Sequence, residues 1–220
     1  MDWTAVWLTF RLAASTALIL LVAGLPLGYW LATTRWRGRF AVEAVVALPI
    51  VLPPTVLGFY LLLALGPRGP VGRLVHTLTG GALPFTFTAI LIGSVLFNLP
   101  FAVRPFTAAF SAVDRKLVEA SWCLGASKLR TFWRLMLPLS WAGVLTGIVL
   151  SFAHTVGEFG VVLMLGGNRP GVTRTLSVVI YDEVQAMNYA AANATAAALV
   201  VFSFVVLCVT YALQRRVLPV

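Results

Sequence analysis

A histidine and a glutamate stand four positions apart in one apolar stretch of this sequence, at His154 and Glu158. Residues with this spacing share a helix face, where the pair could exchange a proton or contribute to a metal site. Both kinds of chemistry need further partners, and no other histidine or carboxylate stands close by in the sequence. His76 is distant, and the two cysteines, Cys123 and Cys208, have no metal-type spacing. These residue types therefore predict no catalytic residue, no metal site and no cofactor.

The composition of the chain indicates that lipid is its solvent. Of its 220 residues, 60% are apolar and only 10% are charged, and the mean hydropathy is +0.95. A soluble domain is about half apolar and about a quarter charged. The net charge of +9 could suggest nucleic acid, but the basic residues stand between apolar runs, as the membrane orientation rule would place them. We therefore expect a membrane protein with no nucleic-acid partner.

Five apolar runs are long enough to cross a bilayer, which takes roughly 20 residues per helix. The runs are continuous, whereas the strands of a membrane barrel alternate between apolar and polar residues. The predicted fold class is therefore an all-α integral membrane protein, with residues 1–220 forming a single transmembrane domain. The predicted spans are residues 12–31, 42–65, 87–106, 139–165 and 192–213.

The distribution of lysine and arginine predicts the orientation of these spans. Basic residues gather in the links at 35–39 and 104–134 and at the chain end, 215–216. The richer set belongs on the cytoplasmic side. The sequence thus predicts a multi-pass membrane protein with its amino terminus outside and its carboxyl terminus inside. The two remaining links hold only Arg68, Arg73, Arg169 and Arg174.

The cytoplasmic link at 111–138 predicts two short amphipathic helices separated by a glycine elbow. Asp114 and Ser127 are suited to cap the two helices, and Gly125 is suited to end the first. Such a pair could merely rest on lipid headgroups. The small residues Ala120 and Ser121 instead favour a docking element for a soluble partner, because they allow another backbone to approach closely.

The spacing within this link resembles the EAA loop of ABC importer permeases. That loop has the pattern Glu-Ala-Ala, three residues, Gly, nine residues, then Ile, any residue, Leu-Pro. Here Ser121 replaces the second alanine and Leu135 replaces isoleucine. The resemblance implies the type I ABC importer permease fold in a bacterial cytoplasmic (inner) membrane. It also implies a coupling helix that fits a cleft on a separate ATPase subunit. The ATPase-coupling residues that it implies are Glu119, Ala120, Ser121, Gly125, Leu135, Leu137 and Pro138.

Further motifs are similar to those of the molybdate and sulfate permeases, and the compact five-span layout is most similar to the molybdate branch. The resemblance implies a homodimer that carries molybdate, two ATPase copies and a periplasmic or extracellular oxyanion-binding protein. Tungstate and sulfate or thiosulfate are the alternative substrates. The matching motifs are Leu48–Val56, Gly157–Gly160, Gly166–Gly171 and Thr173–Thr175.

Prolines and polar residues interrupt several of the runs. They could be ordinary kinks of membrane helices, or they could line a translocation path, since freed backbone carbonyls need a partner in lipid. The pattern leaves both readings open. The candidate path or gate residues are Pro53, Pro54, Asn98, Pro100, Glu158 and Phe159.

Glu158 is expected to have a structural role. At about 1.5 Å per residue it lies roughly 28 Å along a helix that starts at Leu139, near the outer surface. A carboxylate repels an anionic substrate. We therefore expect it to pair with His154, a backbone amide or an outer arginine, at the gate or at the dimer interface.

Three classes of function compete for this sequence. The leading one is a permease driven by another chain, because the sequence lacks the Gly-x-x-x-x-Gly-Lys-Ser/Thr loop that binds nucleotide phosphates. An ATP-independent channel or secondary transporter would have charged relay residues within its spans and inverted repeats, and neither is evident. A membrane-embedded enzyme would need a fuller set of polar residues at one depth.

Overall fold

The computed structural model describes residues 2–217, with side chains through residue 212, so the side chains of Arg215 and Arg216 lie outside it. Over this range the chain forms helices and turns and contains no strand, which confirms the predicted all-α fold. The helices are α1 (Trp3–Ile19), α2 (Leu25–Thr33), α3 (Arg39–Val51), α4 (Pro54–Leu65), α5 (Pro70–Thr79), α6 (Phe87–Ser111), α7 (Arg115–Cys123), α8 (Lys128–Thr131), α9 (Leu137–Leu139), α10 (Trp141–Val156), α11 (Gly160–Gly166), α12 (Leu176–Gln185) and α13 (Tyr189–Val217).

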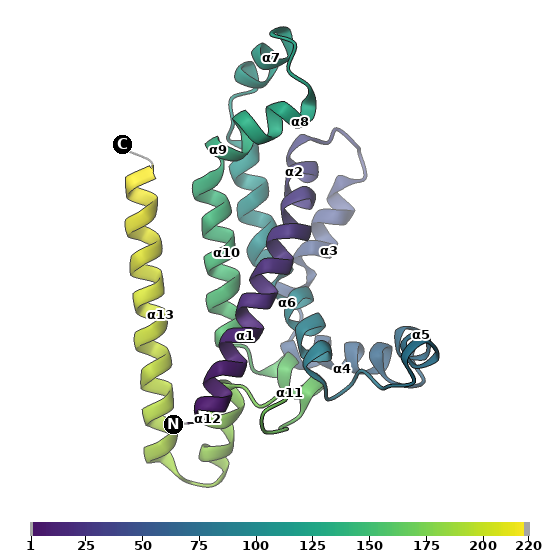
Figure 1. Ribbon diagram of the computed structural model, residues 1–220, viewed down its shortest axis with the longest axis vertical. Helices are drawn as coiled ribbons and strands as arrows, with labels where there is room; N and C mark the ends of the chain where they lie inside the picture. Colours follow the sequence, from purple (N-terminus) through teal and green to yellow (C-terminus); the bar gives the residue numbers. More distant parts are fainter. Residues whose placement is uncertain (1, 218–220) are drawn as a thin grey trace.

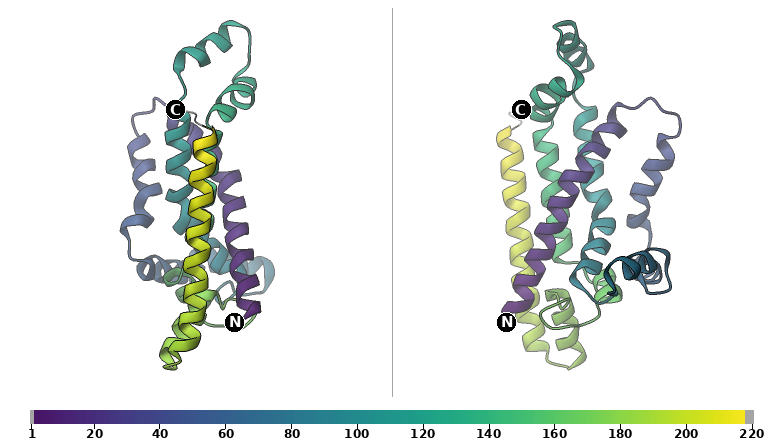
Figure 2. Two further views of the ribbon diagram at one scale, coloured as in Figure 1. Left: turned by 90° about the vertical axis from the view of Figure 1, so that its left-hand side faces the viewer. Right: turned by 45° about the vertical axis from the view of Figure 1, so that its right-hand side comes forward.

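The long helices run side by side along one axis, with different elements gathered at the two ends (Figure 1). The start of α1 lies at one end together with α11 and α12, and we call this the amino-terminal end. The carboxyl end of α13 and the hairpin formed by α7 and α8 lie at the other, which we call the hairpin end. At the amino-terminal end, α4 and α5 project sideways from the body (Figure 2). The start of α1 and the end of α13 thus lie at opposite ends of the molecule, as an odd number of spans requires.

Helix α6 is the centre of the molecule and packs against α1, α2, α3, α10 and α11. Its neighbours approach closely because they carry glycine where they meet Phe106. A Cβ atom on Gly147 of α10 would lie 2.6 Å from Phe106 Cε1, and one on Gly28 of α2 would lie 2.7 Å from Phe106 Cβ. Small residues at such contacts let membrane helices pack tightly without a hydrophobic driving force. Phe106 itself is fully buried.

Three helical stretches are long and apolar enough to cross a membrane without a sharp bend, namely Trp3–Thr33, Phe87–Ser111 and Tyr189–Ala212. The first begins well before the predicted residue 12. Two sharply bent helix pairs could supply two more spans, which would give up to five in all.

The structure divides the predicted span 42–65 at Leu52 and Pro53. Helices α3 and α4 meet there at an angle of 112°. Leu52 and Pro53 are extended, with ψ of 135° each, because a residue before proline is excluded from the helical region. The predicted span 139–165 is divided as well. Helix α10 ends at Val156, and α11 begins after a break at 157–159.

Two further prolines are accommodated by π-helical turns. The turn Leu20–Gly24 comes just before Pro26, and the turn Phe132–Met136 comes just before Pro138. A proline inside a helix lacks an N–H and crowds the preceding turn, and a π-helical turn is one way to absorb this. The apolar stretches therefore continue through both prolines instead of ending there.

Candidate functional site at the coupling hairpin and a buried polar cluster

Helix α7 begins after a capping side chain and ends before a glycine in the left-handed conformation. The Asp114 carboxylate accepts a hydrogen bond from the Lys116 N–H at 2.8 Å. At the other end, the N–H groups of Gly125 and Ala126 donate to the carbonyls of Trp122 and Ser121, at 2.9 and 3.0 Å. This pair of bonds is a Schellman motif, which needs a left-handed residue after the helix, and Gly125 has φ of +81°. The predicted caps and glycine elbow are confirmed.

The two sides of α7 face different surroundings. Val118 is buried in the core that contains Phe110. About half a helical turn away, Leu117, Ala120 and Leu124 are exposed, and Leu124 has 89% of its surface accessible. One side of the helix is thus fixed to the membrane body, and the other is free to meet a partner.

The rest of the hairpin extends this exposed apolar surface. Leu129 is 68% exposed and Trp133 is 59% exposed. We call Leu117, Leu124, Leu129 and Trp133 the hairpin apolar patch. Several exposed large apolar side chains on one short hairpin are typical of a contact with a protein or with lipid.

The residues of the predicted coupling motif divide into two groups. Glu119 is exposed and forms an ion pair with Arg115 at 3.0 Å, while Ser121 shares a hydrogen bond of 2.6 Å with Thr131 of α8. Leu135 and Leu137, by contrast, are partly buried and pack against the core. The first half of the motif therefore shapes the hairpin. The second half, which ends at Pro138, anchors it to the span that follows.

A buried polar cluster lies between α6 and α10. Asn98 of α6 is fully buried, and its Nδ2 donates to Glu158 Oε2 at 3.1 Å and to the Ser94 carbonyl at 2.9 Å. Its Oδ1 lies 2.9 Å from His154 Nδ1, so the two form a hydrogen bond in which the histidine nitrogen is the donor. Asn98 thus bridges the histidine and the glutamate. The expectation that Glu158 pairs with His154, a backbone amide or an outer arginine is corrected, because its carboxylate accepts a hydrogen bond from an asparagine 60 positions earlier.

Neighbouring residues hold the histidine and the glutamate of this cluster in position. The His154 ring stacks on Phe101 with 4.0 Å between ring centroids and 24° between planes. The Glu158 carbonyl accepts a hydrogen bond from the Ser177 hydroxyl, which ties it to α12. Glu158 Oε1 and Ser94 Oγ are both buried and have no hydrogen-bond partner among the residues that the structure describes. The cluster therefore joins three helices, and it keeps one buried carboxylate oxygen unpaired.

The other candidate path residues gather partly around the same break. A Cβ atom on Gly160, where α11 begins, would lie 2.8 Å from Pro54 Cβ, where α4 begins. Phe159 is partly buried between these elements and the core, and its ring centroid lies 5.1 Å from that of Tyr181. Pro100 is buried in α6, two positions beyond Asn98. The break before α11 is thus where the bent second span, α6 and α10 come together.

The loop after α11 contains hydrogen-bonding residues for which the sequence predicted no role. The Thr173 hydroxyl is buried, donates to the Gly166 carbonyl at 2.7 Å and accepts from the Arg169 N–H at 3.2 Å. The Arg169 guanidinium donates to the Phe85 carbonyl at 2.8 Å. The threonines and glycines of this run were a signal that could have indicated a closed loop. In the structure Thr173 closes the loop onto the end of α11, and Arg169 ties it to the segment just before α6.

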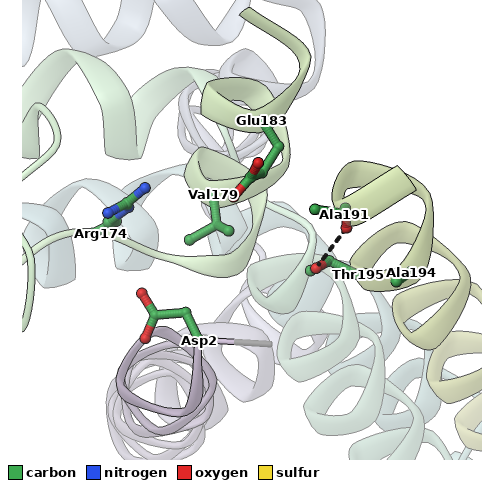
Figure 3. A pocket seen from close by; sticks show the side chains of 7 residues that line it. All are labelled: Asp2, Arg174, Val179, Glu183, Ala191, Ala194 and Thr195. Atoms are coloured by element: carbon green, nitrogen blue, oxygen red, sulfur yellow. Dashed lines mark hydrogen bonds between the residues drawn. The ribbon is translucent and has the colours of Figure 1, made fainter. Parts of the chain in front are cut away.

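A small cavity at the amino-terminal end is a poor site for an anion. It has a volume of about 260 Å³ and lies between the start of α1, α12 and α13 (Figure 3). The carboxylates of Asp2 and Glu183 both line it. Its one lining cation, Arg174, already pairs with Asp182 at 3.0 Å. Because Arg174 is already ion-paired, the two carboxylates that line the cavity would repel an oxyanion.

Comparison with known proteins identifies the class. The family described as "Binding-protein-dependent transport system inner membrane component" matches residues 24–219. The molybdenum transport system permease protein ModB of Azotobacter vinelandii is 50% identical over 214 residues, which cover 97% of this chain and 95% of that protein. The ModB of Escherichia coli K12 is 33% identical over 84% of this chain and 80% of its own. A probable sulfate transport system permease, cysT of Chlorella vulgaris, is 31% identical over 96% of this chain and 79% of its own.

Solved structures agree with this fold. An inward-facing structure of the MetNI methionine ABC transporter contains a chain that matches with a TM-score of 0.78 and 18% identity, over 99% of this chain and 96% of that one. A bacterial ABC transporter that imports alginate matches with a TM-score of 0.79 and 19% identity, over 97% of this chain and 78% of that one. At such identities the likeness concerns the fold.

Proposed function

This chain belongs to the family of inner-membrane components of binding-protein-dependent transport systems, and from that premise we propose that it is the permease subunit of an ATP-driven molybdate importer. The main support for molybdate as the substrate is the 50% identity to a molybdenum permease over nearly the full length of both chains. The sulfate permease of comparable coverage is 31% identical. Tungstate is the next candidate, because it shares the charge and shape of molybdate.

The proposed orientation places the hairpin end in the cytoplasm and the amino-terminal end outside. The lysine and arginine bias of the sequence supports it, since the links at 35–39 and 104–134 lie at the hairpin end. A separate ATPase would then dock on the exposed side of α7, around Ala120 and the hairpin apolar patch. Two ATPases and two copies of this chain would form the transporter.

A periplasmic or extracellular binding protein would deliver the anion to the amino-terminal end. The permease itself would bind the anion weakly, because a path that binds its substrate tightly does not release it. The break before α11, with Pro53, Pro54, Asn98 and Glu158 around it, is the proposed gate region. Its buried carboxyl group is hydrogen-bonded to Asn98 within the packed structure, so we assign it to the structure of the gate and not to substrate binding.

The test measures ATP hydrolysis by the whole transporter in lipid vesicles that contain its binding protein. Molybdate is expected to stimulate hydrolysis, tungstate is expected to do so to a similar degree, and sulfate is expected to have little effect. Stimulation by sulfate with no response to molybdate would contradict the substrate assignment. A vesicle with the binding protein omitted provides the baseline.

A further inference from the structure

A second and larger cavity lies under α7 at the hairpin end. It has a volume of about 720 Å³ and is lined by the ends of α2 and α6, by α7 and by the start of α8. Three of its lining residues are cations, and they come from three different segments: Arg35 follows α2, Arg115 begins α7, and Lys128 begins α8. Segments distant in the sequence thus bring three positive charges to one cavity.

Two of these cations have no counter-charge in the part of the chain that the structure describes. Among the residues that the structure describes, no carboxylate lies within ion-pair distance of Arg35 or Lys128. Arg115 does pair with Glu119, but this pair is exposed, with 70% and 54% of the two side chains accessible. Exposed pairs of this kind contribute little and exchange partners readily. The cavity therefore has a net positive lining that an anion could neutralise.

The other part of the lining is apolar. Tyr29, Phe110 and Met136 line the cavity, and Tyr29 and Phe110 meet edge to face with 5.7 Å between ring centroids. Trp122 of α7 adds an exposed aromatic ring. A ligand that fits this cavity has a charged head and an apolar body. A small, fully hydrated anion would leave the apolar part of the lining unused.

We infer that the cavity binds the phosphate headgroup of an anionic phospholipid, with Arg35, Arg115 and Lys128 around the phosphate and the acyl chains against the apolar lining. The position agrees with this occupant, because the apolar helices α2 and α6 end at the cavity, at Thr33 and Ser111. Basic clusters at this level of a cytoplasmic leaflet attract anionic lipids. The inference rests on the proposed cytoplasmic placement of the hairpin, but not on which anion is transported.

A lipid in this place would act on the coupling hairpin. The lining residues Arg115 and Trp122 lie on the side of α7 that carries Val118, whereas Ala120 and Leu124 lie on the side that is free for a partner. One helix could thus bind a lipid and a protein at the same time. The lipid would hold α7 to the end of α2 and so fix the angle at which the hairpin meets its partner.

The experiment compares two double variants of the purified transporter. Arg35→Gln with Lys128→Gln removes the two unpaired cations of the cavity. Arg37→Gln with Arg130→Gln removes the same charge from the same links, at residues that do not line the cavity. Thermal unfolding is followed in phosphatidylcholine alone, with added phosphatidylglycerol, and with added inorganic phosphate, and bound lipid is counted by native mass spectrometry.

Phosphatidylglycerol is expected to raise the unfolding temperature of the unmodified protein and of the Arg37/Arg130 variant. The Arg35/Lys128 variant should bind this lipid roughly tenfold or more weakly, since each cation near an anionic surface contributes about 1 kcal/mol. Its unfolding temperature in phosphatidylcholine alone should be unchanged, which shows that it folds. If it does not fold, the single variant Lys128→Glu takes its place.

Two results would overturn the inference. Equal protection by inorganic phosphate would show that the cavity takes a free oxyanion instead of a lipid. Equal loss of lipid binding in both double variants would show that the lipid responds to overall charge and not to this cavity. Neither result bears on molybdate-stimulated ATP hydrolysis, so the inference and the proposed substrate can fail separately.

Discussion

Asn98 is the residue on which the buried polar cluster depends. Its amide satisfies a histidine on α10 and a glutamate beyond the end of α10, from a fully buried position on α6. A leucine in its place would fit a membrane helix, but it would leave two polar groups without partners in an apolar setting. Polar side chains within membrane proteins usually face other helices for this reason.

Replacing Asn98 by alanine is expected to lower the free energy of unfolding by about 2 to 4 kcal/mol. The change removes three hydrogen bonds and leaves the His154 and Glu158 side chains without this partner, and each buried group left unpaired costs about 1 to 3 kcal/mol. Unfolding in mixed micelles of increasing denaturing detergent measures the difference. The control is Asn193→Ala, the same chemical change at an exposed position of α13, which should have no measurable effect. Equal stability of the two variants would mean that the cluster does not stabilise the fold.

Replacing Glu158 by glutamine should be tolerated better than replacing it by alanine. Glutamine keeps a side-chain oxygen that can accept the hydrogen bond from Asn98 Nδ2, whereas alanine removes it. We expect the glutamine variant to unfold within about 1 kcal/mol of the unmodified protein and the alanine variant to lose about 1 to 3 kcal/mol. The same detergent titration measures both. A glutamine variant that unfolds as readily as the alanine variant would show that the negative charge itself is required.

The helices differ in how far their features could be predicted from the local sequence. The caps Asp114 and Ser127 and the elbow Gly125 could be predicted, because each acts on backbone groups within a few residues. The 112° bend at Pro53 could not, since apolar side chains suit a helix that crosses the membrane and one that turns aside equally well. The bridge from Asn98 to Glu158 could not be predicted either. It joins residues 60 positions apart, and no local pattern indicates which helices meet.

The elbow at the end of α7 allows a sharp test of the coupling surface. A Cβ atom on Gly125 would meet nothing within 4 Å, so a substitution there strains only its own backbone, by about 1 to 2 kcal/mol. Asparagine tolerates the left-handed conformation, whereas leucine does not and also adds bulk on the free side of α7. We expect Gly125→Asn to co-purify with the ATPase and Gly125→Leu to lose about tenfold or more in association, at near-normal levels in the membrane. A leucine variant that co-purifies and transports normally would show that the hairpin only rests on lipid.

The contact between α6 and α10 should tolerate no added side chain. Gly147→Ala would place a methyl group 2.6 Å from Phe106 Cε1 and 3.0 Å from the Ala102 carbonyl, so a packed helix must shift. The expected loss of stability is about 1 to 3 kcal/mol, which is typical of overpacking. Gly81→Ala is the matched control, because its nearest atom would be the Thr79 hydroxyl at 3.6 Å. Thermal unfolding of the two variants in the same detergent distinguishes them.

The arrangement of the whole molecule leads to a test of its orientation. Arg68, in the link between α4 and α5, and Lys128, the first residue of α8, belong to elements at opposite ends of the structure (Figure 1). Cysteines are placed at these two positions in a background with Cys123 and Cys208 changed to serine. An impermeant maleimide added to intact cells with a permeable outer membrane should label position 68 and not position 128. Both should react after the cytoplasmic membrane is opened. Labelling of position 128 in intact cells would reverse the proposed orientation.

The position of α13 at the edge of the molecule has a mechanical consequence. In its most apolar stretch 11% of residues are buried, against 50% for α6, and it packs mainly on α10 and α12. Within a single chain, lipid therefore holds α13 in place more than the other helices do. A force applied to the carboxyl end should extract α13 first, as a separate event at low force. The more densely packed helices would yield only at higher force, and together, because α6 joins them.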